Sequence, residues 1–152
     1  MGLKRSFKTD NILEVKGIII EHDDVRIRVA RAGGANKAFT KALANATRPH
    51  QRAVKVGAMS EKKSNEILMK VYANTIVLAW EKNTGTETEP VWSSGIDPED
   101  TGAKPGGDLL PVTEENIIKV FTELPELFID LVSQTQNSSL FLAELSEDLA
   151  KN

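Results

Sequence analysis

The segment Val25–Ala30 (VRIRVA) constrains the fold more than any other part of the chain. Its apolar residues alternate strictly with arginines, so that one face is hydrophobic and the other basic. Strict alternation with β-branched residues predicts a half-buried strand. The apolar set is Val25, Ile27 and Val29, and the basic set is Arg26 and Arg28.

A second strand is predicted just before it, over Asn11–Glu21 (NILEVKGIIIE), which is rich in Ile and Val. The short polar connection His22-Asp23-Asp24 suits a tight turn. Residues 11–31 therefore predict a β-hairpin with one wet, basic face. Because a lone hairpin is marginal in water, other elements must cover its apolar face.

The rest of the chain supplies helices for that purpose. Ala35–Thr47 has high helix propensity, and a long, central, largely buried helix is predicted from Ser60 to about Lys82. Apolar residues at helical spacing predict three more helices, which begin near Thr113, at Pro125 and after Asn137. The last is expected to carry Leu140, Phe141, Leu142, Leu145 and Leu149 on its apolar face.

Residues 83–112 contain five glycines and four prolines and sustain neither a helical nor a strand period. We expect a long Gly/Pro-rich loop there. The predicted fold class is α+β and mostly helical, with an N-terminal β-hairpin followed by about five helices. The chain divides into a basic hairpin-plus-helix part (1–82), a flexible acidic loop (83–112) and an acidic helical part (113–152), which we expect to form one domain.

The sequence contains no cysteine and two histidines, which excludes a disulfide scaffold, a zinc ribbon and a thiol nucleophile. The N-terminus lacks the apolar core of a secretory signal, and the longest apolar window, Ile67–Trp80, is too short to span a bilayer. We expect a soluble, cytosolic protein without membrane contact.

No catalytic or metal-binding motif emerges from the spacing of the polar residues. His22 and His50 have no ligand-type partner three or four residues away. Gly33-Gly34 stands between a strand and a helix, where phosphate-binding loops occur, but a tight turn explains it better because no complete nucleotide motif is present. The acidic residues around Asp97 do not match a calcium loop. We predict no enzyme activity, no cofactor and no metal.

Charge is divided unevenly along the chain. Residues 1–82 hold ten lysines and six arginines against eight acids, a net charge of +8, and residues 83–152 hold three lysines against fourteen acids, a net charge of −11. Between Val25 and Ser60 there is no acid at all. We predict a partner-binding role for seven residues: Arg26, Arg28, Arg31, Lys37, Lys41, Arg48 and Trp92.

Nucleic acid is one conceivable partner for that basic stretch. Only Phe39 is aromatic within it, which is too little for a base-stacking platform, and the pI of the chain is 5.5. Opposite charge on the two halves also permits contact between copies of the chain, so that a homo-oligomer is possible.

The order of these features resembles the tail assembly chaperones of long-tailed, siphovirus-like bacteriophages. The resemblance rests on packing patterns and extends from about Lys16 to Asn152. Its parts are Ala30–Phe39, the segment Val77-Leu78-Ala79-Trp80, the stretch from Thr113 through Leu124-Pro125-Glu126-Leu127-Phe128, and the ending Glu147-Asp148-Leu149-Ala150-Lys151-Asn152. The loop at 83–112 is longer than in that pattern.

The resemblance implies a non-enzymatic role: binding the tape measure protein and recruiting major tail tube subunits in the cytoplasm of the infected bacterial host, without retention in the mature virion. It also implies that a longer form, made by ribosomal frameshifting, accompanies the short one. The alternatives are a small structural subunit of a phage particle and a nucleic-acid-binding module that uses residues 25–60.

Overall fold

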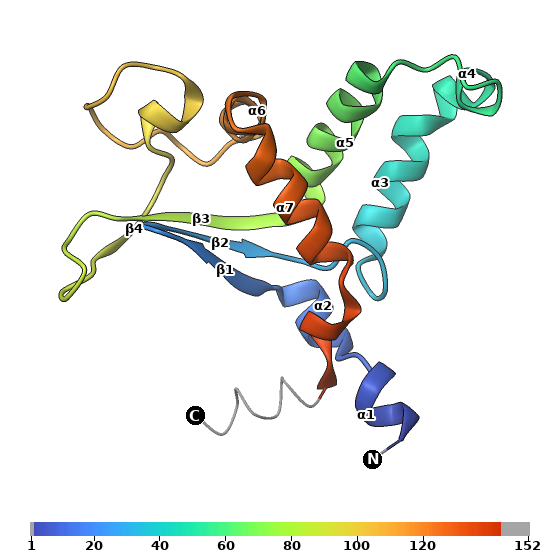
Figure 1. Cartoon of the computed structure of the whole chain (residues 1–152), viewed down its shortest axis with the longest axis horizontal. Helices are drawn as coiled ribbons and strands as arrows, with labels where there is room; N and C mark the ends of the chain where they lie inside the picture. Colours follow the sequence, from blue (N-terminus) through green and yellow to red (C-terminus); the bar gives the residue numbers. More distant parts are fainter. Residues whose placement is uncertain (1, 144–152) are drawn as a thin grey trace.

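The computed structural model describes residues 2–143 as a four-stranded antiparallel sheet with helices packed on one face (Figure 1). The strands lie in the order β1-β2-β3-β4 and are β1 (Ile18–His22), β2 (Val25–Val29), β3 (Val77–Asn83) and β4 (Trp92–Ser94). The α-helices are α1 (Leu3–Phe7), α2 (Asn11–Lys16), α3 (Lys37–Thr47), α4 (Gln51–Lys55), α5 (Glu61–Thr75), α6 (Glu114–Glu123) and α7 (Pro125–Gln136). Short 3-10 turns are η1 (Arg48–His50), η2 (Pro98–Thr101) and η3 (Ser138–Phe141). The predicted class, α+β and mostly helical, is confirmed.

The hairpin of β1 and β2 is confirmed, with Ile20 paired opposite Ile27 and a two-residue turn at Asp23-Asp24. Its predicted first strand begins too early, because residues 11–16 form α2. The Asp10 carboxylate caps that helix by accepting hydrogen bonds from Ile12 N (2.8 Å) and Leu13 N (2.9 Å). Gly17, at φ +87°, ends it in a conformation that favours glycine.

The long helix predicted from Ser60 to Lys82 is wrong in its second half. Ser60 does cap α5, since its hydroxyl accepts from Lys63 N at 3.1 Å, but the helix ends at Thr75. The following segment becomes β3 and pairs with β2, which places Trp80 opposite Ile27. A run that is apolar on all sides fits a buried strand as well as a buried helix, and the β-branched Ile76 and Val77 favour the strand.

Residues 83–112, predicted as one loop without regular structure, contain β4 and η2. β4 extends the sheet by pairing Trp92 with Asn83. Ile96 is fully buried and exchanges two backbone hydrogen bonds with Leu110, at 2.9 and 2.7 Å. These contacts attach both ends of the segment to the sheet.

The helices after the loop begin as predicted. The Thr113 hydroxyl caps α6 by accepting from Asn116 N at 3.3 Å, and Pro125 occupies the first position of α7. Asn137 accepts a hydrogen bond from Ser139 N where η3 starts. The described start of the predicted final helix is only a 3-10 turn, because Leu142 is extended and forms a β-bridge with Thr9. The rest of that prediction, from residue 144 onward, lies outside the described residues.

One hydrophobic core joins the basic and acidic parts of the chain. Tyr72 of α5 lies edge-on to Phe39 of α3 (centroid distance 5.8 Å) and to Phe128 of α7 (5.4 Å). Its hydroxyl, fully buried, is 2.9 Å from Thr135 Oγ1. Trp80 brings the sheet into the same core through Phe121 of α6, at 6.3 Å. The opposite face of the sheet, which carries Arg26 and Arg28, is left without a covering helix along most of its length (Figure 1). No helix within residues 2–143 is long and apolar enough to cross a bilayer.

Candidate partner-binding surfaces

The seven predicted partner-binding residues do not form one surface. The uncovered face of the sheet carries Arg26, Arg28 and Trp92. Arg31 belongs to the segment that connects β2 to α3, and the remaining three residues lie on the arm formed by α3, η1 and α4. The three remaining residues are Lys37, Lys41 and Arg48.

On the sheet face, Arg26 and Trp92 are held by each other and by a carboxylate. Arg26 Nε donates to Glu81 Oε1 at 2.8 Å, and the guanidinium carbon is 4.4 Å from the centre of the Trp92 ring. Arg28 is exposed and reaches only the carbonyls of Lys16 and Gly17, at 3.5 and 3.4 Å. Arg28 is therefore the member of this group whose charge is most available to a partner.

Arg31 instead supports the fold. Its Nη1 donates to Glu14 Oε2 at 2.6 Å, and the Glu14 side chain is only 1% exposed. Thr9 Oγ1 donates to the same carboxylate at 2.8 Å, and Ala35 N at 3.3 Å. Burial alone would raise the pKa of Glu14, but these hydrogen bonds and the nearby guanidinium outweigh it and lower the pKa below 4.5.

The glycine turn noted in the sequence surrounds this carboxylate. Gly34, at φ +54°, leaves room for it: a Cβ there would collide with the Glu14 carboxylate and lie 2.8 Å from Arg31 Nη1. The turn after β2 therefore does hold an anion, and that anion is a side chain of the chain itself.

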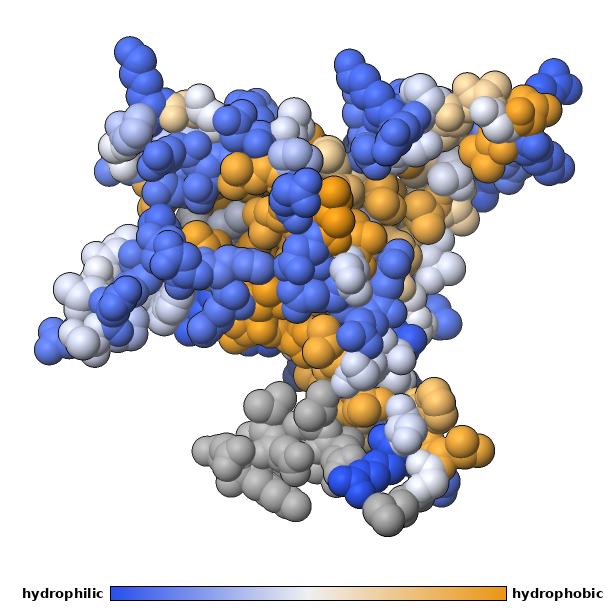
Figure 2. Space-filling view, viewed as in Figure 1, coloured by the Kyte–Doolittle hydropathy of each residue, from blue (hydrophilic) through white to orange (hydrophobic). Residues whose placement is uncertain are grey.

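The arm ends in a projecting tip, which we define as Arg52, Val54, Lys55 and Val56. α4 packs mainly against η1. Val54 is 54% exposed and Val56 71% exposed, and both basic residues of the tip are exposed as well. Figure 2 shows hydrophobic residues gathered at this end of the molecule, where Figure 1 places α4. Lys37, Lys41 and Arg48 are exposed along the same arm.

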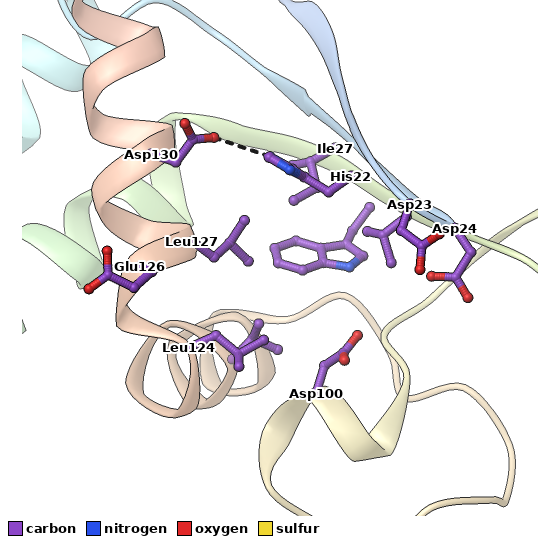
Figure 3. Close-up of a pocket in the computed structure, with 12 residues that line it drawn as sticks. His22, Asp23, Asp24, Ile27, Asp100, Leu124, Glu126, Leu127 and Asp130 are labelled. Carbon is purple, nitrogen blue, oxygen red and sulfur yellow. Dashed lines mark ion pairs between the residues drawn. The ribbon is translucent and has the colours of Figure 1, made fainter.

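A cavity of about 420 Å³ lies at the other end of the molecule, between the β1–β2 turn, η2, α6 and α7 (Figure 3). Sequence reasoning did not find it, because four segments far apart in the chain build it. We call it the acidic cavity. Its apolar lining is Val25, Ile27, Trp80, Val120, Leu124 and Leu127, and its ionisable lining is His22, Asp23, Asp24, Asp100, Glu126 and Asp130.

Two of the acids near the cavity share one cationic partner. Lys82 Nζ lies 2.5 Å from Asp24 Oδ2 and 3.1 Å from Asp97 Oδ2. The pKa of Asp97 is lowered, chiefly because its carboxylate accepts a hydrogen bond from Glu99 N and also because Lys82 is close. Burial of Asp97 acts in the opposite direction but is outweighed. Burial would lower the pKa of Lys82, but its two carboxylate partners raise it instead.

Asp100 differs from its neighbours. Burial, followed by the negative charge of Asp97, raises the pKa of this carboxyl group, and Lys82 offsets only part of the rise. Figure 3 shows Asp100 pointing from η2 toward the interior of the cavity, to the side of Leu124 and below Leu127. The cavity thus presents an incompletely neutralised carboxylate beside apolar walls.

His22, considered above as a lone histidine, lies at the edge of this cavity. Its Nε2 is 3.2 Å from Asp130 Oδ2, which also accepts from Gln134 Nε2 at 2.7 Å (Figure 3). Within residues 2–143, no group of three or more His, Cys, Asp or Glu side chains is arranged to hold a metal ion.

A third surface is apolar and belongs to the N-terminal helices. Leu3 and Phe7 of α1 are 78% and 70% exposed, and Ile12 and Val15 of α2 are 67% and 48% exposed. We call these four side chains the N-terminal apolar surface. Large exposed side chains gathered on two successive helices are typical of a docking surface.

In a comparison with protein families, the family described as YdaY prophage protein matches residues 34–152, which is most of the chain. Neither the curated proteins nor the solved structures include a match to this chain.

Proposed function

Because the chain belongs to the YdaY prophage protein family, we propose that it acts during assembly of a phage particle, as a tail assembly chaperone that works by binding alone. In this proposal it binds the tape measure protein and recruits tail tube subunits in the host cytoplasm, and it leaves before the virion is complete. A longer, frameshifted form of the chain accompanies it.

The N-terminal apolar surface carries this proposal. A tape measure protein is a long helical rod, and before assembly its apolar stripes need cover. Two helices that expose Leu3, Phe7 and Ile12 offer the complementary apolar contact. The exposed Arg28, whose guanidinium reaches the carbonyls of Lys16 and Gly17 at the end of α2, adds an interaction worth about 0–1 kcal/mol, weak enough to be exchanged when tube subunits arrive.

The test is coexpression of the full chain with the tape measure protein of the same prophage, followed by affinity capture. We expect the wild-type chain to keep the tape measure protein in solution and to retain it on the resin. The Phe7→Asp/Ile12→Asp variant should lose it, whereas Val91→Asp, which alters a 56% exposed valine elsewhere, should not. Equal recovery with all three proteins would remove the N-terminal apolar surface from the proposal.

The composition of purified virions separates this function from the structural alternative. A chaperone should be absent from the mature particle. Stoichiometric retention of the chain, measured by quantitative mass spectrometry, would instead identify a small structural subunit.

A further inference from the structure

The tip and the acidic cavity have matching chemistry on one molecule. The tip is an apolar end flanked by cations, and the cavity is an apolar hollow flanked by carboxylates. The apolar side chains of the tip are not needed to hold the fold together: α4 lies at the end of the arm, and Val54 and Val56 contribute most of their surface to solvent.

Within residues 2–143, neither cation of the tip takes part in an ion pair. Arg52 and Lys55 are exposed, and the sequence from Val25 to Ser60 contains no Asp or Glu. Two exposed valines next to two exposed cations suit a partner that is apolar at its centre and negative at its rim.

The acidic cavity has that composition. Val25, Leu124 and Leu127 are lining residues whose apolar surface solvent reaches. Asp23 and Asp100 supply negative charge, since the ion pairs of Lys82 are with Asp24 and Asp97. Its volume of about 420 Å³ lies in the range of pockets that accept small ligands or a few side chains. It is therefore large enough for the side chains of the tip, but not for a whole helix.

We propose that the tip of one copy inserts into the acidic cavity of the next copy, with Val54 and Val56 against the apolar walls and Arg52 and Lys55 facing the carboxylates. Figure 1 places α4 and η2 on opposite sides of the molecule, so a chain cannot insert its own tip. The contact is heterologous: it joins different surfaces of two copies and generates an open row or a ring. It does not depend on the tape measure protein.

Sedimentation of the purified full chain tests this contact. We expect the average mass to rise with protein concentration at low salt and to rise less at about 1 M salt, where the Debye length is about 3 Å. The tip variant Val54→Ser/Val56→Ser and the cavity variant Leu124→Lys should each weaken association by at least roughly tenfold.

Each variant has a matched control. Val91→Ser removes a similarly exposed valine away from the tip, and Ile129→Lys adds a cation to α7 without lining the cavity. Both controls should associate like the wild-type chain. Since all five mutated positions are at least 41% exposed, loss of folding is not expected, and circular dichroism checks it.

Mixing the two variants gives the decisive measurement. The tip variant keeps an intact cavity and the cavity variant keeps an intact tip, so one complete contact forms and the mixture should stop at dimers. A monomeric wild-type chain at all concentrations, or unchanged association of both variants, would overturn the proposal. If the Trp80 indole signal shifted with a basic helical peptide while the chain stayed monomeric, the cavity would belong to another partner.

Discussion

At the scale of single residues, the ion pair of the buried Glu14 with Arg31 is expected to contribute clearly to the free energy of unfolding. Glu14→Ala leaves the guanidinium, itself 22% exposed, without its carboxylate and removes the acceptor for Thr9 and Ala35. We expect a loss of about 1–3 kcal/mol in the free energy of unfolding, measured by urea denaturation. Glu81→Ala breaks the more exposed pair with Arg26 and should cost only about 0–1 kcal/mol. Equal losses would contradict the structural role of Glu14.

The same pair makes stability depend on pH. The pKa of Glu14 is lowered in the folded chain, so its stabilising effect is complete above the usual value of 4.5 and is lost as the pH falls through the lower, folded value. Unfolding measured between pH 7 and 2.5 should therefore show a smaller acid-dependent loss in Glu14→Gln than in the wild-type chain. Parallel curves would show that Glu14 does not contribute to the acid sensitivity.

Gly34 permits a second test of this cluster. Gly34→Ala introduces a methyl group where the Glu14 carboxylate lies, in addition to the strain of a residue at φ +54°. Gly57→Ala is the control, because Gly57 has φ +69° and no described atom within 4 Å of the added Cβ. Gly57→Ala should cost about 1–2 kcal/mol from the backbone alone, and Gly34→Ala clearly more. Equal costs would mean that the carboxylate moves aside freely.

At the scale of elements, α5 and α7 are joined by the hydroxyl of Tyr72, whose pKa burial raises despite the hydrogen bond with Thr135. Tyr72→Phe should cost about 0.5–1.5 kcal/mol, since Thr135 keeps its bond to the Leu131 carbonyl at 2.7 Å. A double-mutant cycle with Thr135→Val measures the coupling. Strict additivity would show that the two hydroxyls do not interact.

The elements also show how far the sequence predicts this fold. The alternation in β2, the caps Ser60 and Thr113, and Pro125 are local signals, and each marks an element that begins where it was expected, although the helix after Ser60 ends earlier. Residues 77–83 could not be assigned locally, because their state depends on pairing with β2, some fifty residues earlier. The N-cap Asp10 and the C-cap Gly17 of α2 are also local signals, but the many Ile and Val residues around them favoured the prediction of a strand there.

The candidate sites likewise divide into features that local sequence predicts and features that depend on contacts between distant segments. Exposed cations on the α3–α4 arm could be predicted from composition, since that segment contains no acidic residue to form an ion pair with them. The roles of Arg26 and Arg31 could not, because Glu81 and Glu14 reach them only through the fold. The acidic cavity is formed by four segments that are separate in the sequence, so no local sequence pattern predicts it.

At the scale of the whole molecule, the basic stretch is divided between a sheet face, a buried pair and an arm. A continuous phosphate-binding surface would need these cations side by side. We therefore expect no retention of double-stranded DNA in filter binding at about 50 mM salt. Retention that falls steeply with salt, and that Lys37→Glu/Lys41→Glu abolishes, would reverse this conclusion.

The order of the strands has a practical consequence for anyone working with fragments. The family match starts at residue 34, and both β1 and β2 precede that point. A recombinant product cut there would lack the ribbon that shields one side of β3, and Trp80 would lose its cross-strand neighbour Ile27. Bare hydrophobic edges recruit other chains. Such a product should appear in inclusion bodies, and adding the first 33 residues back should recover it in the supernatant.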